Sequence, residues 1–317
     1  TDLRTKNKIT ANTKFRIASV TKQFTTVCIL QLVAEQRIEL STQINKYVPF
    51  VSKKITIEHL LTHTSGLPSY DDKDLTNDFY QKDFTPYELV HLIQNDKRIS
   101  KPEQQYYYNN SGYHILGYII EQVSGVSYQT YLQENIFNPL GLIETHYESS
   151  QSTILNLAKG YELTDSIFSP SLYYSMTQPY SAGSIVSTPK DLSKWNNALF
   201  SHNFIPDSLL KLAHQSYQLT DGSDTHYGYG WIIGELQGET KIGHGGFLEG
   251  FNSTLYYLPK SKISVAVLSN CSAFPSDKLA NQLGAIAIQK PIIEKKSIQL
   301  EISELYKFEG EYDVTEA

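Results

Sequence analysis

A serine and a lysine three residues apart, Ser19 and Lys22, form a pair of side chains that could perform chemistry together. Apolar residues follow Lys22 with few breaks as far as Ala34, which predicts a buried helix that begins near Ser19. Residues three apart share one face of a helix, so the hydroxyl and the amine are within reach of each other. A buried amine is costly unless it is paired or neutral, and a serine needs a neighbouring base to become a nucleophile. The pair therefore indicates nucleophilic acyl transfer.

The pattern Ser-x-x-Lys alone is weak evidence for a catalytic serine, because chance matches are common. The alternative is a serine that caps a helix and a lysine whose stem lies on the surface while its ammonium reaches solvent. From this segment alone, neither interpretation is preferred.

Residues 15–22, FRIASVTK, resemble the nucleophile motif of class C β-lactamases, DD-peptidases and β-lactamase-like esterases. Four further segments resemble motifs of the same family in the same order: ITIEHLLTHTSGLP (55–68), YYYNNSGYHILG (106–117), SAGSIVSTPKDL (181–192) and GHGGF (243–247). The matches cover about residues 12 to 290. On this resemblance the chain is identified as a member of the serine β-lactamase-like and penicillin-binding family.

The resemblance implies a covalent acyl-enzyme in which Ser19 attacks a carbonyl carbon. Lys22 either keeps a positive field that lowers the pKa of Tyr108 from its reference value of ~10, or itself takes the serine proton if it is neutral. Tyr108 is then expected to carry protons to the leaving group and to activate the hydrolytic water. Without the motif, Tyr108 would be interpreted as a core tyrosine.

The second and third motifs imply groups that support the substrate. Asn110 is expected to bind Lys22 and a substrate amide, with a turn residue as the alternative. The oxyanion hole is expected to combine the backbone N–H groups of Ser19 and Phe247.

Two glycines of the third motif, Gly245 and Gly246, fit a strand that lines a groove, because they allow the backbone to approach closely.

His244 carries the information about substrate. The β-lactamases and DD-carboxypeptidases of this family usually have a lysine there, which helps to hold a free carboxylate. A histidine with a reference pKa of ~6.5 is mostly neutral at pH 7 and attracts a carboxylate less. This favours esters or D-amino-acid-containing peptides as substrates. A class C-like β-lactamase is one alternative, a non-catalytic peptidoglycan- or peptide-binding protein is another, and His244 itself has the alternative of merely supporting its strand.

Composition excludes several classes of function. Of the 317 residues, 40% are hydrophobic and 19% are charged, which predicts a folded chain. The net charge of -6 does not favour a basic surface that would bind nucleic acid. The apolar run 27–34 is too short for a membrane span, which needs ~20 residues. His59 and His63 lack the glutamate and third ligand of a metal site, so no metal and no other cofactor is expected. The expected partner is a small-molecule or peptide substrate.

The elements that must position these residues follow from caps and strand patterns. Threonines at 56, 85 and 188 predict helix starts, residues 127–136 and 276–289 predict two further helices, and residues 226–233, 240–244, 253–258 and 263–268 predict strands. The fold class is therefore α/β (α+β), an antiparallel sheet flanked by helices. A mostly helical subdomain at about 55–180 is inserted in a catalytic domain of residues 1–295, and 296–317 form a linker or the start of a truncated C-terminal β-domain.

The N-terminal region departs from the family, and only eighteen residues precede Ser19. Relatives normally carry a helix and two strands of the sheet there, so the sequence predicts a three-stranded remainder with an exposed edge. The first residues lack the apolar stretch of a signal peptide, and export to the periplasm or the outside is expected from the family alone.

Overall fold

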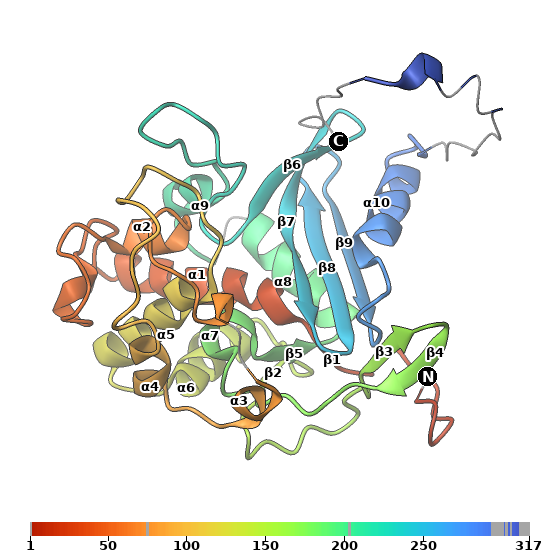
Figure 1. The fold of residues 1–317 in the computed structure, drawn as a ribbon, viewed down its shortest axis with the longest axis horizontal. Coiled ribbons are helices and arrows are strands. Elements are labelled where there is room, and N and C mark those ends of the chain that lie inside the picture. The colour runs from red at the N-terminus through yellow and green to blue at the C-terminus, as the bar shows by residue number, and fades with distance from the viewer. Residues whose placement is uncertain are drawn as a thin grey trace.

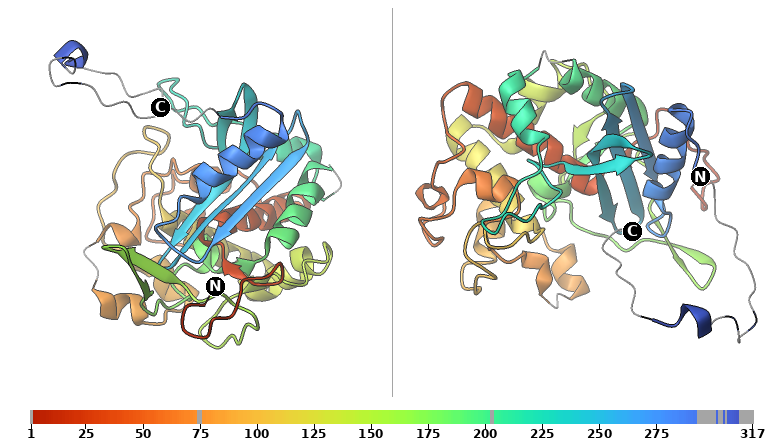
Figure 2. Two further views of the ribbon diagram at one scale, coloured as in Figure 1. Left: turned by 90° about the vertical axis from the view of Figure 1, so that its right-hand side faces the viewer. Right: turned by 90° about the horizontal axis from the view of Figure 1, so that it is seen from above.

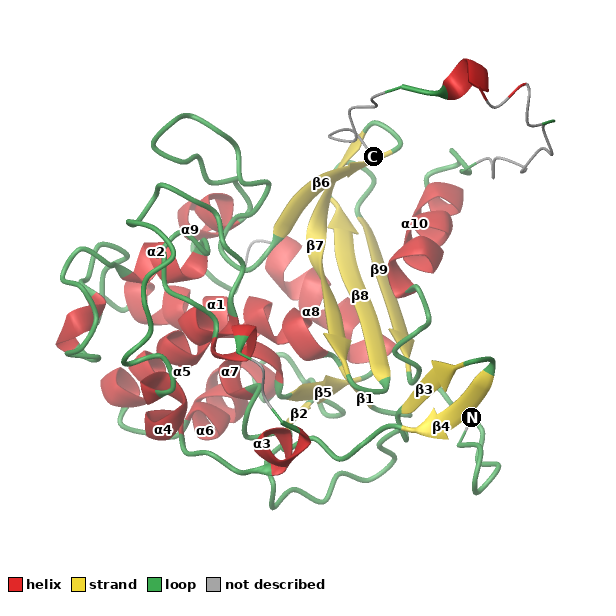
Figure 3. Ribbon diagram, in the orientation of Figure 1, coloured by secondary structure: helices red, strands yellow, loops and turns green. Residues whose placement is uncertain are grey.

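The computed structural model describes residues 2–73, 76–201, 204–292, 301, 304 and 306–310. An antiparallel sheet stands between one long C-terminal helix and a helical region, as Figure 1 and the right panel of Figure 2 show. Strands gather on one side of the molecule and most helices on the other (Figure 3). The predicted mixed α/β class is confirmed. No described helix combines the length and the apolar character that crossing a membrane requires.

The sheet contains four strands in the order β6-β7-β8-β9. This is one strand more than the three-stranded sheet that the sequence predicted. The bounds are β6 (Ile232–Leu236), β7 (Glu239–Leu248), β8 (Phe251–Leu258) and β9 (Ile263–Ser269). Helix α10 (Ser276–Ala287) covers one face and α8 (Pro189–Phe200) lies against β8 and β9. The predicted hairpin of the last two strands is confirmed. Among the residues described, no strand pairs with the outer side of β9, so the expected open edge lies there.

The first of these strands begins later than predicted, at Ile232 instead of residue 226. Two glycines interrupt the pattern: Gly230 has φ +84°, and a Cβ on Gly228 would lie 2.1 Å from the carbonyl oxygen of Ala213. Residues 226–231 therefore form a tight turn against a helix end, which tertiary packing imposes.

Helix α1 (Thr21–Ala34) is the central helix of the molecule, and the predicted buried helix is confirmed. Its core side chains are fully buried, Cys28 among them, and Phe24 stacks on Trp195 at 4.0 Å between ring centroids. Ser19 lies just before this helix, in the 3-10 turn η1 (Ala18–Val20). Around α1 lie three helices, α5 (Asn110–Ser124), α6 (Tyr128–Leu132) and α7 (Tyr180–Gly183).

A second, small sheet contains the strand that directly precedes Ser19. Its strands are β1 (Phe15–Arg16), β5 (Ile185–Ser187) and β2 (His146–Tyr147), all antiparallel in that order. Arg16 makes two hydrogen bonds of 2.8 Å to the carboxylate of Glu148, which fastens β1 just before Ser19.

The predicted threonine caps are confirmed, because they depend on local sequence. Thr85 and Glu88 form a capping box, Thr188 caps α8, and Thr56 caps α2 (Ile57–Leu61). The remaining described elements are α3 (Asn77–Gln81), α4 (Pro86–His91), α9 (Asp207–Ala213), the hairpin β3 (Tyr161–Thr164) with β4 (Ile167–Pro170), and the short turns η2 (Ile44–Lys46), η3 (Tyr70–Asp72), η4 (Gln133–Phe137) and η5 (Tyr306–Phe308). Most of 296–317, where a linker or β-domain was expected, lies outside the described residues.

Candidate active site

The hydroxyl of Ser19 and the amine of Lys22 meet in the structure. Lys22 Nζ donates to Ser19 Oγ at 3.0 Å and to the carbonyl oxygen of Ala182 at 3.1 Å. Lys22 is completely buried, whereas Ser19 is half-buried and lines a cleft of about 220 Å³. Ala18, the residue just before Ser19, has a backbone φ of +46°, a conformation that residues other than glycine rarely adopt. Such strain is typical of functional turns, and here it presents the serine hydroxyl at a sharp bend.

Tyr108 approaches the same amine from the helical side. Lys22 Nζ lies 4.8 Å from the centre of the Tyr108 ring, and the Ser19 side chain is close enough to the Tyr108 hydroxyl to act on its pKa. Tyr108 is therefore not a core tyrosine, and 37% of its surface is exposed.

Asn110 is the first residue of α5 and completes the group. Its Oδ1 accepts a hydrogen bond from Lys22 Nζ at 2.8 Å. The side chain of Asn109 caps the helix by accepting from Gly112 N at 2.7 Å. Asn110 therefore lies in a helix and not in the alternative turn, and the contact with Lys22 that the motif implied is present.

Strand β7 closes the cleft from the other side because Gly246 has no side chain. A Cβ at this position would lie 2.2 Å from Ile17 O and 2.4 Å from Ser253 Oγ. Ser253 Oγ in turn donates to Ile17 O at 2.8 Å, which joins β8 to the turn before the nucleophile. Phe247 and Ser19 consequently line the same cleft. Their N–H groups as the oxyanion hole, and substrate contact by Gly245, stay predictions.

The electrostatics of the site favour one of the two proton routes. Burial lowers the pKa of Lys22 to about 7, against the opposing charge of Asp71. Burial raises the pKa of Tyr108 well above its usual value, although the neighbouring Ser19 side chain acts in the other direction. Lys22 is not among the groups that shift the Tyr108 pKa, so the charges do not support the route in which Lys22 lowers that pKa, and proton transfer by Tyr108 stays a prediction. The arrangement supports neutral Lys22 as the base.

His244 lies behind the cleft and is only 5% exposed. Its Nε2 is 3.0 Å from the Tyr227 hydroxyl, and its Nδ1 is 2.5 Å from Gly245 O. Burial, and then the charge of Lys22, lower the His244 pKa to about 3, so the ring is neutral at pH 7. It is not among the side chains that line the cleft. This position fits the alternative role of supporting the strand better than direct contact with substrate.

His59 on α2 and His63, which lies after the end of this helix, have structural partners. His59 Nδ1 accepts from Thr56 N at 3.1 Å and completes the cap of α2. His63 is buried, with its ring 4.4 Å from the ring of Tyr108 and its Nδ1 accepting from Asn109 N at 3.3 Å. Within the described ranges, no group of three or more His, Cys, Asp or Glu side chains is arranged to hold a metal ion.

Sequence reasoning missed two carboxylates, Asp71 and Glu249, that line the cleft. Asp71 accepts a hydrogen bond from Asn110 Nδ2 at 2.8 Å. Its only sequence signal is its place just after the 55–68 motif, in a loop whose shape is not encoded locally. Burial raises the pKa of Glu249.

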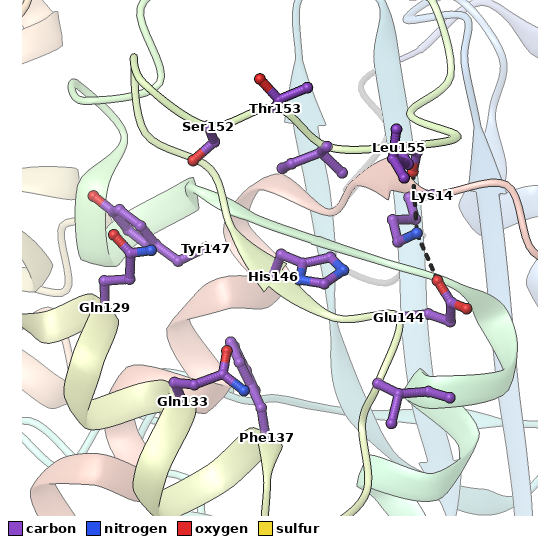
Figure 4. A pocket seen from close by; sticks show the side chains of 12 residues that line it. Lys14, Gln129, Gln133, Phe137, Glu144, His146, Tyr147, Ser152, Thr153 and Leu155 are labelled. Atoms are coloured by element: carbon purple, nitrogen blue, oxygen red, sulfur yellow. Dashed lines mark hydrogen bonds and ion pairs between the residues drawn. The ribbon is translucent and has the colours of Figure 1, made fainter.

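A separate cavity of about 460 Å³ lies beside β2 (Figure 4). Its amine, Lys14, is paired with Glu144 at 2.5 Å and donates to Leu155 O at 3.0 Å. This amine is therefore neutralised by a carboxylate, and none of the hydroxyls drawn there is bonded to it. The Ser19 cleft is the candidate active site.

In this cleft a serine is hydrogen-bonded to a buried lysine, between a helical region and strand β7 of the antiparallel sheet. This arrangement defines a serine acyl-transfer site of the lysine-dependent class. Residues 1–289 match the Beta-lactamase family, and the chain belongs to that family. Membership supports serine hydrolase activity.

Individual relatives agree with this assignment. Protein flp of Staphylococcus aureus (strain NCTC 8325 / PS 47) is 28% identical over 327 residues, which cover 99% of this chain and 63% of the relative. The chain thus spans less than two thirds of that protein. A D-stereospecific amidohydrolase from Streptomyces sp. has a similar structure, with a TM-score of 0.77, 26% identity and 86% of each chain covered. A penicillin-binding protein from Bacillus halodurans has a TM-score of 0.77 and 28% identity, over 88% of this chain and 86% of its own. The predicted β-lactamase/transpeptidase-like fold is confirmed.

Proposed function

We propose that this chain is a serine hydrolase that forms an acyl-enzyme at Ser19 with esters or D-amino-acid-containing peptides. The observation that carries the proposal is the 3.0 Å contact between Lys22 Nζ and Ser19 Oγ inside a cleft. Burial that lowers the Lys22 pKa to about 7 supports its role, because a base works best when its pKa is near the working pH.

In the proposed reaction, neutral Lys22 takes the Ser19 proton while Oγ bonds to the substrate carbonyl carbon. The developing oxyanion is held by backbone N–H groups of Ser19 and Phe247. The alcohol or amine leaves with the proton from Lys22, passed directly or through the Tyr108 hydroxyl. Water then repeats the sequence on the acyl-enzyme: it gives a proton to Lys22 while its oxygen bonds to the carbonyl carbon. The bond from that carbon to Ser19 Oγ then breaks, Oγ takes the proton from Lys22, and the carboxylic acid product leaves.

The charges in the cleft support esters, and amides or peptides without a free carboxylate near the reacting bond, over β-lactams. Asp71 and Glu249 line the cleft, and its residues include no lysine, arginine or histidine. A substrate with a free carboxylate would meet carboxylates and no surface cation. The similar amidohydrolase acts D-stereospecifically according to its name, which agrees with D-configured peptides or amides as candidates here.

An activity-based fluorophosphonate probe tests the enzyme proposal. The intact chain is expected to be labelled, Ser19→Ala is expected to lose the label, and Ser152→Ala, beside the separate cavity, is the matched control that keeps it. An intact chain that stays unlabelled would instead support the binding-protein alternative.

Substrate class is tested by comparing p-nitrophenyl esters and D-alanine p-nitroanilide with nitrocefin. The proposal expects faster turnover of the first two. Rapid hydrolysis of nitrocefin alone would assign the chain to the β-lactamase alternative.

A further inference from the structure

Asp71 has no role in the reaction described above, yet it is connected to Lys22 through one amide. Asn110 Oδ1 accepts from Lys22 Nζ at 2.8 Å, and Asn110 Nδ2 donates to Asp71 Oδ2 at 2.8 Å. The three side chains come from α1, from the start of α5 and from the turn η3. They form a continuous path from the cleft surface to the buried amine.

The carboxylate determines which way the amide points. An ionised carboxylate only accepts hydrogen bonds, so it can pair with the NH₂ end of Asn110 and not with the oxygen. Lys22 in turn only donates when it is charged, and it needs the oxygen. If the amide were reversed, its NH₂ group would face the amine and its oxygen would face Asp71. Both contacts would then be lost.

The turn η3 holds Asp71 and the backbone of Asn110 with the same residue, Ser69. The Ser69 hydroxyl donates to Asp71 Oδ1 and accepts from Asn110 N at 2.9 Å. Asp72 Oδ2 accepts from Ser69 N at 2.8 Å, which fixes Ser69 in turn. Ser69 is only 4% exposed, so its end of this ring is buried, whereas the Asp71 carboxylate faces solvent.

We propose that Asp71 is a positioning residue for the reaction: its carboxylate orients the Asn110 amide so that the oxygen faces Lys22. The negative charge of Asp71 also favours the protonated amine. This inference rests on the proposed function, because it concerns the base of that reaction. It assigns to Asp71 the control of how readily Lys22 gives up its proton.

The other groups around Lys22 do not supply that charge. The rings of Tyr108 and Tyr113 face Nζ at 4.8 and 5.5 Å, and burial raises the pKa of both phenols. His63, from the segment after α2, His114 on α5 and His244 on β7 act on Lys22 only as neutral rings, because burial lowers the pKa of all three. Among the described groups that shift the Lys22 pKa, Asp71 is the one that raises it.

Two substitutions separate orientation from charge. Asp71→Asn keeps an oxygen that can accept from Asn110 Nδ2 but removes the charge. Asp71→Leu removes both. Asp78→Asn, on the nearby helix α3, removes the same charge from an exposed residue outside the hydrogen-bonded ring and serves as the matched control.

The direct measurement is the titration of Lys22, followed by ¹³C NMR of labelled lysine and assigned with Lys22→Arg. In Asp71→Asn the midpoint is expected to fall by up to about one pH unit, because a solvent-facing carboxylate is partly screened. Asp78→Asn is expected to leave it unchanged. An unchanged or higher midpoint in Asp71→Asn would overturn the inference, whether or not the chain is an enzyme.

Activity gives the second readout. The acidic limb of kcat/KM against pH is expected to move down with the NMR midpoint in Asp71→Asn, with an alkaline plateau within about threefold of the intact chain. Asp71→Leu is expected to lose about 10- to 100-fold at the plateau, because the amide is no longer oriented. A plateau in Asp71→Leu equal to that of Asp71→Asn would contradict the orienting role. If the intact chain is not labelled by the fluorophosphonate probe, the proposed function is refuted, and this result is independent of the Lys22 titration.

Discussion

At Lys22, burial and hydrogen bonding act in opposite directions. The amine has three oxygen partners, Ser19 Oγ, Asn110 Oδ1 and Ala182 O, which all stabilise its charged form. Desolvation nevertheless dominates and brings the pKa to about 7. The amine is therefore about half neutral at pH 7, and it remains held in place in either form.

The pH dependence of acylation follows from this titration. Neutral Lys22 is the active form, so kcat/KM is expected to rise with pH and to level off above about pH 7. Two pH units below that point, activity should fall about 100-fold, because each unit lowers the neutral fraction tenfold. Lys22→Arg should abolish the reaction, since arginine stays charged. A profile that is flat between pH 5 and 8 would contradict this role for Lys22.

The structure changes what is expected of His244→Lys. The resemblance implied that a lysine at this position would help to hold a free carboxylate. In the structure, however, the ring is buried, hydrogen-bonded to Tyr227 and close enough to Lys22 for its charge to act on the ring. A second ammonium there is expected to destabilise the fold by roughly 3 kcal/mol or more and to reduce ester hydrolysis. His244→Gln, which can still bond Tyr227, is the control for thermal unfolding and activity. A stable His244→Lys protein with improved turnover of carboxylate substrates would restore the earlier interpretation.

At the scale of elements, the turn η1 and strand β7 are in contact without an intervening side chain. Gly246→Ala would place a methyl group 2.2 Å from Ile17 O and is expected to destabilise the fold by about 2–3 kcal/mol and to open the cleft. Gly245→Ala is the matched control, because its nearest contact would be Ser253 O at 3.8 Å. Thermal unfolding and ester hydrolysis of the two variants check this. Equal stability of both would show that β7 can move away from η1 without cost.

The elements that were predictable depend on local sequence. Threonine caps, the apolar helix behind Ser19 and the hairpin of β8 and β9 each follow from residues that are neighbours in the chain. The start of β6 was not predictable, because the turn at Gly228 exists only through contact with Ala213. Helix α5 was missed because its first turn falls inside a motif dominated by tyrosines and asparagines.

The site was predictable only in part, because some of its contacts depend on tertiary packing and not on local sequence. Ser19 and Lys22 are one helical turn apart, and family motifs supplied Tyr108 and Asn110. Asp71 reaches Asn110 across 39 residues of sequence, through a loop whose path depends on tertiary packing. The desolvation that raises the pKa of the Tyr108 hydroxyl is likewise a property of the assembled fold.

At the scale of the whole molecule, the net charge of -6 and the two carboxylates in the cleft favour positively charged acyl groups. For esters with one leaving group, kcat/KM is expected to be higher for a cationic than for an anionic acyl chain. Added salt should reduce this preference. Glu249→Gln should also reduce it, whereas Glu134→Gln, an exposed residue of η4, changes net charge equally and should not. No difference between the two variants would locate the preference outside the cleft.

The buried amine also couples folding to pH. Lys22 releases its proton near pH 7 when folded, against a reference value of 10.5. Between these values the unfolded chain binds more protons, so the free energy of unfolding is expected to rise with pH, by about 3 kcal/mol from pH 7 to pH 10 for this residue. Urea unfolding of the intact chain and of Lys22→Met isolates the contribution as the difference between their pH dependences. Parallel curves would show that Lys22 titrates alike in both states.

The two cysteines give the molecule its own reporters. Cys28 is fully buried in α1, on the helix that carries Lys22, and Cys271 is partly exposed. A thiol reagent should therefore modify Cys271 quickly, and reach Cys28 only in molecules whose central helix has separated from its surroundings. The rate of the slow phase then measures how often the interior around the nucleophile opens, without any introduced cysteine.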